Sequence, residues 1–202
     1  MQIEPIEFDF ETTRLVFHPE SFGNHAVSQA LKITLPLRFK MTCKNSKNSC
    51  ALNSNFDEML QQRLVSAGFA LFKPDLPPGL EKRSDFGFEI GGIKIVFEIE
   101  KANWEKIFYD IFKAHIYLKS GADFFVLMLP LAYGHANGTE PLFEIAKTRF
   151  EQSQKVGYGD PLLLKKILLV GFDQLYDGQE FSHVLRNKLR DISSNYFQSK
   201  AT

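Results

Sequence analysis

Three acidic residues and a pair of glycines lie close together near the middle of this 202-residue chain. Asp85 precedes Gly91-Gly92, and Glu98 and Glu100 end the apolar run that follows the glycines. Side chains alternate between the two faces of a strand, so Glu98 and Glu100 project from the same face. A hairpin at the glycines folds the strand of Asp85 back beside Glu98. We expect three carboxylates to converge, which would offer the oxygen ligands that hard divalent cations such as Mg²⁺ prefer.

Such a carboxylate cluster suits the hydrolysis of a phosphodiester bond. That reaction needs a nucleophilic water, stabilised charge on the phosphoryl oxygens and a stabilised leaving oxygen, and one or two Mg²⁺ ions can serve all three needs. Glu100 is then a candidate to accept the proton of the attacking water, or to hold that water through a metal. The alternative is that Glu98 and Glu100 are the solvated face of an amphipathic strand. The added presence of Asp85 and the hairpin favours the metal site.

The elements around this cluster predict an α/β fold, with α and β elements mixed along the chain. The order is helix, hairpin, helix, strand, helix, strand, helix, which indicates a central mixed β-sheet flanked by helices on both faces. Hydrophobic spacing and stop signals predict the individual elements. Helices are expected at 20–37, 55–67, 104–119, 141–154 and 182–197, and strands at 69–72, 123–129 and 166–172 in addition to the hairpin.

Length and composition predict a single domain over residues 1–202. Residues 1–18 are expected to form an N-terminal arm or strand, and the polar stretch 40–54 a mobile loop. That stretch contains the two cysteines, Cys43 and Cys50, which lack zinc-site spacing and are interpreted as reduced thiols.

The overall charge places a mild limit on function. Lys and Arg number 24, as do Asp and Glu, so the net charge is zero and nucleic-acid binding would need a local basic cleft. The acidic N-terminus does not resemble a signal peptide, and no apolar run approaches a membrane span. We therefore expect a cytoplasmic protein with no membrane association.

The order of these motifs resembles the PD-(D/E)XK nuclease fold. It is most similar to the BglII/BamHI/BstYI group of type II restriction endonucleases, over roughly the last two thirds of the chain. The matching segments are Ser84-Asp85-Phe86, Val96-Phe97-Glu98-Ile99-Glu100, Tyr109-Asp110-Ile111-Phe112, Val126-Leu127-Met128-Leu129-Pro130, the loop 157–161 and Leu168-Leu169-Val170-Gly171-Phe172. Each motif is short, so the specificity of the resemblance lies in their order.

The resemblance implies roles for individual residues. Asp85 and Glu98 would bind the metal, and Glu100 would complete the catalytic set at the position where most of the superfamily has Lys and this group has Glu or Gln. Lys101 comes one residue too late to replace that Lys. It is assigned with Asn103 to DNA binding, and Asn103 is also suited to cap the helix that follows.

The upstream helix should supply one further polar residue, for which Asn55 and Glu58 are the candidates. The function implied by the resemblance is that of a Mg²⁺-dependent type II restriction endonuclease. It would cut palindromic double-stranded DNA as a homodimer, with a site built around GATC suggested by the nearest family members. Two alternatives stay open: a PD-(D/E)XK nuclease of repair or phage defence, and a catalytically inactive DNA-binding protein of the same fold.

Overall fold

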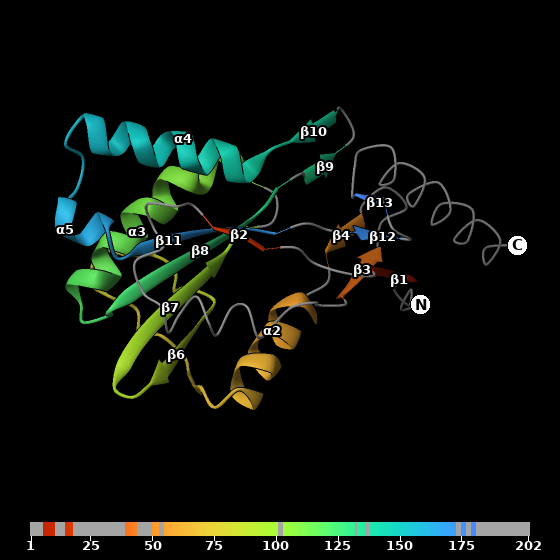
Figure 1. Ribbon diagram of the computed structural model, residues 1–202, viewed down its shortest axis with the longest axis horizontal. Helices are drawn as coiled ribbons and strands as arrows, with labels where there is room; N and C mark the ends of the chain where they lie inside the picture. Colours follow the sequence, from red (N-terminus) through yellow and green to blue (C-terminus); the bar gives the residue numbers. More distant parts are fainter. Residues whose placement is uncertain are drawn as a thin grey trace, which may run out of the picture.

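The fold is built around a six-stranded mixed sheet (Figure 1). The computed structural model describes residues 6–10, 15–17, 39–43, 50–52, 55–100, 103–131, 133–135, 138–172, 175–176 and 179–180. The order across the sheet is β2-β11-β8-β7-β6-β5. The bounds are β2 (Leu15–Phe17), β5 (Ala70–Phe72), β6 (Phe86–Ile90), β7 (Ile93–Ile99), β8 (Phe124–Pro130) and β11 (Ile167–Phe172). The strands β7, β8 and β11 are parallel, while β5-β6-β7 and β2-β11 pair antiparallel. The predicted mixed sheet is therefore confirmed.

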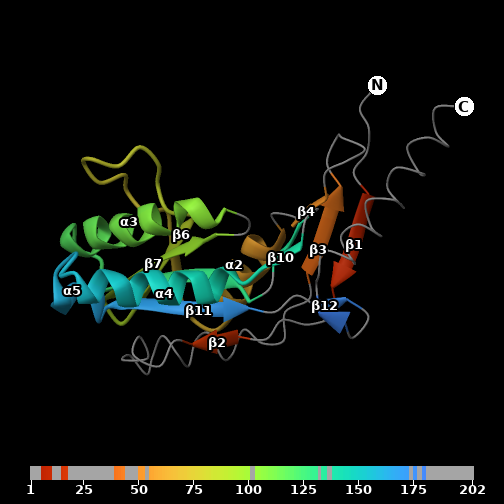
Figure 2. The same ribbon diagram turned by 90° about the horizontal axis from the view of Figure 1, so that it is seen from above.

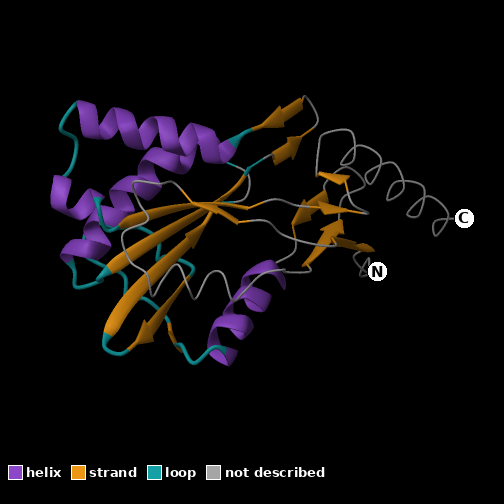
Figure 3. Cartoon of the chain, viewed as in Figure 1, coloured by secondary structure: helices purple, strands orange, loops and turns teal. Residues whose placement is uncertain are grey.

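Helices cover both faces of this sheet (Figures 1 and 3). The described helices are α2 (Asn55–Ser66), the 3-10 turn η2 (Trp104–Lys106), α3 (Ile107–Lys119), α4 (Leu142–Lys155) and the short α5 (Pro161–Leu164). Both α3 and α4 pack on one face, and α2 lies on the other (Figure 1). None of the helices in the described part of the chain is long and apolar enough to cross a membrane.

The core beneath α3 and α4 holds β7 and β8 in place. Ile111, Ala114 and Phe150 of the helices pack with Leu127 and Leu169 of β8 and β11, and all five side chains are buried. The strands β8 and β11 are buried on both faces, as expected for parallel strands between helical layers. The predicted all-apolar runs at these positions are confirmed.

An aromatic cluster fills the opposite face. Phe86, Phe88 and Phe97 contact one another with ring centroids 5.0–5.5 Å apart, and Phe69, just after α2, contacts Phe88 edge-to-face. Because Phe97 faces this cluster, its neighbour Glu98 projects to the side of α3.

The hairpin between β6 and β7 forms at the two glycines, as predicted. Gly91 and Gly92 both have positive φ, 55° and 80°. These angles suit a two-residue turn whose central residues both need φ above zero, and glycine adopts them without steric cost. The register pairs Phe86 with Phe97, so the next position outward sets Asp85 opposite Glu98.

The N-terminal segments contribute strands. β1 (Ile6–Phe10), β3 (Phe39–Cys43) and β4 (Cys50–Leu52) form an antiparallel sheet beside the main one (Figure 2), and β2 joins the main sheet next to β11. The expected loop at 40–54 therefore holds two strands, with Cys43 and Cys50 at paired positions. Backbone pairing with β1 stabilises this polar segment, which its composition does not reveal.

Two short strand pairs complete the description. β9 (Tyr133–His135) pairs with β10 (Gly138–Glu140), and β12 (Leu175–Tyr176) pairs with β13 (Gln179–Glu180). The helices expected at 20–37 and 182–197 lie outside the described residues.

Candidate active site

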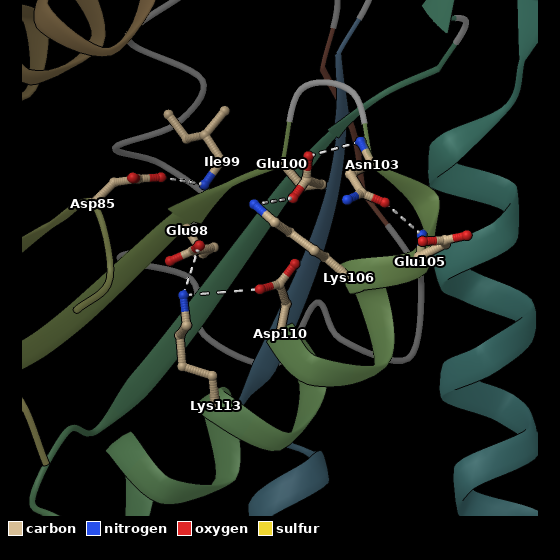
Figure 4. A network of polar contacts seen from close by, with 9 residues as sticks. All are labelled: Asp85, Glu98, Ile99, Glu100, Asn103, Glu105, Lys106, Asp110 and Lys113. Carbon is tan, nitrogen blue, oxygen red and sulfur yellow. Dashed lines mark hydrogen bonds and ion pairs between the residues drawn. The ribbon is translucent and has the colours of Figure 1, made fainter. Parts of the chain in front are cut away.

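Asp85, the residue before β6, lies beside the end of β7 that contains Glu98, at the open end of the hairpin (Figure 4). The Asp85 backbone N–H donates to the carbonyl of Phe97 at 3.1 Å, and Asp85 Oδ2 accepts from the Ile99 N–H at 2.8 Å. Two backbone contacts to one strand fix the position of this carboxylate. Asp85 is exposed, whereas the side chain of Glu98 is only 14% exposed. The two carboxylates therefore differ in exposure, with Asp85 at the surface and Glu98 largely buried.

A buried lysine from α3 contacts this carboxylate pair. Lys113 Nζ lies 2.7 Å from Glu98 Oε1 and 3.8 Å from Asp110 Oδ1, and its side chain is 3% exposed. Its ammonium also lies 5.6 Å from the centre of the Tyr109 ring. A buried ammonium is stable only where acceptors and negative charge replace its hydration. Glu98 and Asp110 supply both.

Asp110 adds a further carboxylate from the same helix. It is 1% exposed and lies one helical turn before Lys113, so both side chains face the sheet. Among the described residues, neither Asp110 Oδ2 nor Glu98 Oε2 has a hydrogen-bond partner, although both atoms are buried. Ser84 lies close enough to Glu98 to favour its charged form, without hydrogen-bond geometry to Oε2. Two buried acceptor atoms are thus left open at this site.

Glu100 belongs to a second part of the same network (Figure 4). Its Oε1 accepts from the Asn103 N–H at 2.9 Å, and its Oε2 lies 3.6 Å from Lys106 Nζ. Asn103 in turn caps η2, because its Oδ1 accepts from the Glu105 N–H at 3.0 Å. The expected capping role of Asn103 is confirmed. Glu100 is buried and closely held at the start of the loop into η2.

Burial and mutual repulsion raise the pKa of the inner carboxyl groups. Burial is the main cause of the raised pKa of Glu98, the charge of Asp85 adds to it, and Lys113 opposes it. Burial followed by the charge of Glu98 raises the pKa of Asp110 to about 7. Burial alone would lower the pKa of Lys113, but its hydrogen bond to Glu98 and the surrounding carboxylates raise it. Lys113 therefore stays charged.

The donor set fits a hard divalent cation. Carboxylate oxygens are the ligands that Mg²⁺ prefers, and the open Oε2 of Glu98 lies on the strand directly opposite Asp85. Within the described residues, however, no three His, Cys, Asp or Glu side chains are grouped closely enough to hold a metal ion among them. Lys113 contacts Oε1 of Glu98, whereas Oε2 has no hydrogen-bond partner among the described residues. Asp85 and Glu98, through this second oxygen, are therefore the residues that could hold the ion.

The remaining predicted site residues are Asn55, Glu58 and Lys101. Glu58 is exposed on α2, and its described hydrogen bond is with Gln62. Asn55 begins α2, which lies on the opposite face of the sheet from α3. Lys101 lies outside the described residues.

Sequence reasoning assigned no role to Asp110, Lys113 or Lys106. Asp110 stood within a matched motif, and the three-residue spacing to Lys113 places both on one helical face. That spacing was the available signal. It shows that the pair shares a face, but not that this face is buried against Glu98.

The strand order and helical layers define an α/β fold of the restriction-endonuclease-like class. One solved structure with this fold is that of the restriction endonuclease BglII complexed with a DNA 16-mer. That structure aligns with a TM-score of 0.50 and 11% identity over 80% of this chain and 76% of BglII. Free BglII aligns with a TM-score of 0.44 and 13% identity over 84% of this chain and 79% of BglII. No protein-family model matches the sequence, and neither does any curated protein.

Proposed function

We propose that this chain is a divalent-metal-dependent endonuclease that cuts double-stranded DNA at specific palindromic sites, related to the BglII/BamHI/BstYI group. The observation that carries the proposal is the carboxylate pair of Asp85 and Glu98 at the strand ends of a restriction-endonuclease-like sheet. A bound Mg²⁺ would stabilise charge on the phosphate and favour the ionised form of a water. A GATC-containing recognition site rests on the resemblance alone.

The residues of this chain would divide the work as follows. Asp85 and Glu98 would hold the ion, because one is exposed to incoming substrate and the other keeps a buried oxygen open. Glu100, oriented by Asn103 and Lys106, would accept a proton from the attacking water. Asn103 and Lys101 follow the catalytic strand directly and would contact DNA.

A homodimer fits the palindromic target and an exposed apolar surface formed by η2 and α3. Three aromatic residues recur there at four-residue spacing: Trp104, Phe108 and Phe112. Their side chains are exposed, so they are not part of the monomer core. Arg149 of α4 stacks over the rings of Trp104 and Phe108, at 4.9 and 4.7 Å, and donates to the Trp104 carbonyl. The two active sites of a two-fold dimer would be related by the DNA dyad.

A plasmid-cleavage assay with Mg²⁺ or with EDTA tests the proposed activity. Discrete bands that require Mg²⁺ support a site-specific nuclease, and sequencing their ends gives the recognition site. A smear would instead favour a repair or defence nuclease. DNA binding without cleavage would favour an inactive DNA-binding protein, the reading consistent with the Lys113–Glu98 ion pair as a permanent replacement for a metal. A single chain per duplex, measured by light scattering at saturating protein, would contradict the dimer.

A further inference from the structure

We propose that Lys113 is a built-in cation of this active site, which takes the place of a second metal ion and limits the site to one divalent ion held by Asp85 and Glu98. The inference rests on the proposed function, since it concerns the same carboxylates. It identifies a positioning residue that comes from α3 and lies outside the strand motif.

The two carboxylate oxygens of Glu98 lie in different surroundings. Oε1 lies 2.7 Å from Lys113 Nζ, whereas the buried Oε2 has no hydrogen-bond partner among the described residues. Asp85 lies opposite Glu98, and its Oδ2 accepts a hydrogen bond from the Ile99 N–H. One oxygen of Glu98 is therefore taken by an ammonium and the other is open toward a partner. This division favours one ion on the Asp85 side and the lysine on the α3 side.

Asp110, the second carboxylate in contact with Lys113, supports the same interpretation. Asp110 is 1% exposed, lies 3.8 Å from Lys113 Nζ through Oδ1, and has no partner at Oδ2. Glu98 and Asp110 together present to Lys113 the oxygen environment that a second divalent ion would use. Lys113 is also 3% exposed, so solvent does not compete for its charge.

The formal charges agree with one ion. The network contains four carboxylates, Asp85, Glu98, Glu100 and Asp110, and two ammonium groups, Lys106 and Lys113. When all four carboxylates are ionised, two negative charges are left in excess, which a single divalent ion balances. A second divalent ion would give the network two excess positive charges. It would also have to displace the buried Lys113.

The test counts Mn²⁺ bound to EDTA-treated protein by electron paramagnetic resonance of free Mn²⁺, without DNA. We expect one Mn²⁺ per chain for the wild type. Lys113→Met should bind a second Mn²⁺, or bind the first about tenfold more tightly, because one positive charge and one ligand competitor are lost. The matched control is Lys119→Met, since Lys119 is exposed in the last turn of the same helix and belongs to no part of the network described above. That variant should bind Mn²⁺ like the wild type.

Two results would overturn the assignment of Lys113. One is a wild type that binds two Mn²⁺ per chain, or none. The other is a Lys113→Met protein that binds Mn²⁺ with the number and affinity of the wild type. Lys113→Met leaves two buried carboxylates without a cation, so its folding is checked by circular dichroism with and without Mn²⁺.

If Lys113→Met does not fold, two further variants decide the question. Asp110→Asn is compared with the double variant Lys113→Met/Asp110→Asn, which loses one charge of each sign. The double variant should bind Mn²⁺ about tenfold more tightly than Asp110→Asn, and equal affinity would overturn the assignment. The plasmid assay reports separately on the proposed function. Wild-type protein that binds one Mn²⁺ but leaves plasmid intact would contradict the nuclease, not the role of Lys113.

Discussion

Asp110 should make the stability of this protein depend on pH in a way that one substitution removes. Its pKa is raised from 3.8 to about 7, chiefly by burial and then by the charge of Glu98. Below about pH 4 the carboxyl is protonated in both the folded and the unfolded state, so it carries no charge penalty. As the pH rises from 4 to 7, the unfolded chain ionises first, and the folded state loses stability relative to it. Above pH 7 the full penalty is present.

The size of the effect follows from the shift. Each pKa unit corresponds to about 1.4 kcal/mol, so a shift from 3.8 to about 7 corresponds to about 4 kcal/mol. Asp110→Asn keeps the shape of the side chain and cannot ionise. Its free energy of unfolding relative to the wild type should therefore rise by about 4 kcal/mol between pH 4 and pH 8.

Urea unfolding at a series of pH values measures this difference, with EDTA present so that no metal binds. Titrations of groups that do not interact with Asp110 cancel when the variant is subtracted from the wild type. Asp75→Asn, at an exposed position of the 73–83 loop, is the control and should show no such pH-dependent gain. A difference between Asp110→Asn and wild type that is constant from pH 4 to 8 would refute the reasoning.

Two further predictions concern the catalytic strand and a close backbone contact. Glu98→Ala should abolish plasmid cleavage and leave DNA binding in a gel-shift assay unchanged or stronger, because a metal ligand and a charge that repels phosphate are both lost. Glu144→Ala, at an exposed position of α4, should cut normally, and a Glu98→Ala protein that cuts at the wild-type rate would rule out the metal role. Gly159→Ala should destabilise the protein by about 1–3 kcal/mol in urea unfolding, because its φ is +88° and a Cβ there would overlap with the ring of His115. Gly157→Ala is matched to it, with φ +67° and open space around its Cβ, so a loss as large as that of Gly159→Ala would argue against the overlap.

Local rules were enough to predict the strand half of the site. The period of two places Glu98 and Glu100 on one face, and the two glycines require a tight turn. Together they predict Asp85 beside Glu98, and extending the observed register by one position beyond Phe86–Phe97 sets them opposite each other. The same local signals predicted α2, α3, α4, β8 and β11 to within a few residues, because hydrophobic periodicity and Gly or Pro punctuation act over short distances. The strands β3 and β4 were not predicted, since β3 is stabilised by pairing with β1 and β4 by pairing with β3, and not by an apolar pattern.

The helix half of the site was decided only by tertiary structure. Lys113 follows Glu98 by 15 positions, and in the sequence it reads as an ordinary charge on an amphipathic helix. Packing of α3 across the sheet buries Lys113 and Asp110 and brings the ammonium to 2.7 Å from Glu98. The same packing leaves Trp104, Phe108 and Phe112 exposed, although large apolar side chains at helical spacing are typical of a core. Spacing defines which residues share a helical face, but the orientation of the helix on the sheet decides whether that face meets carboxylates, apolar side chains or water.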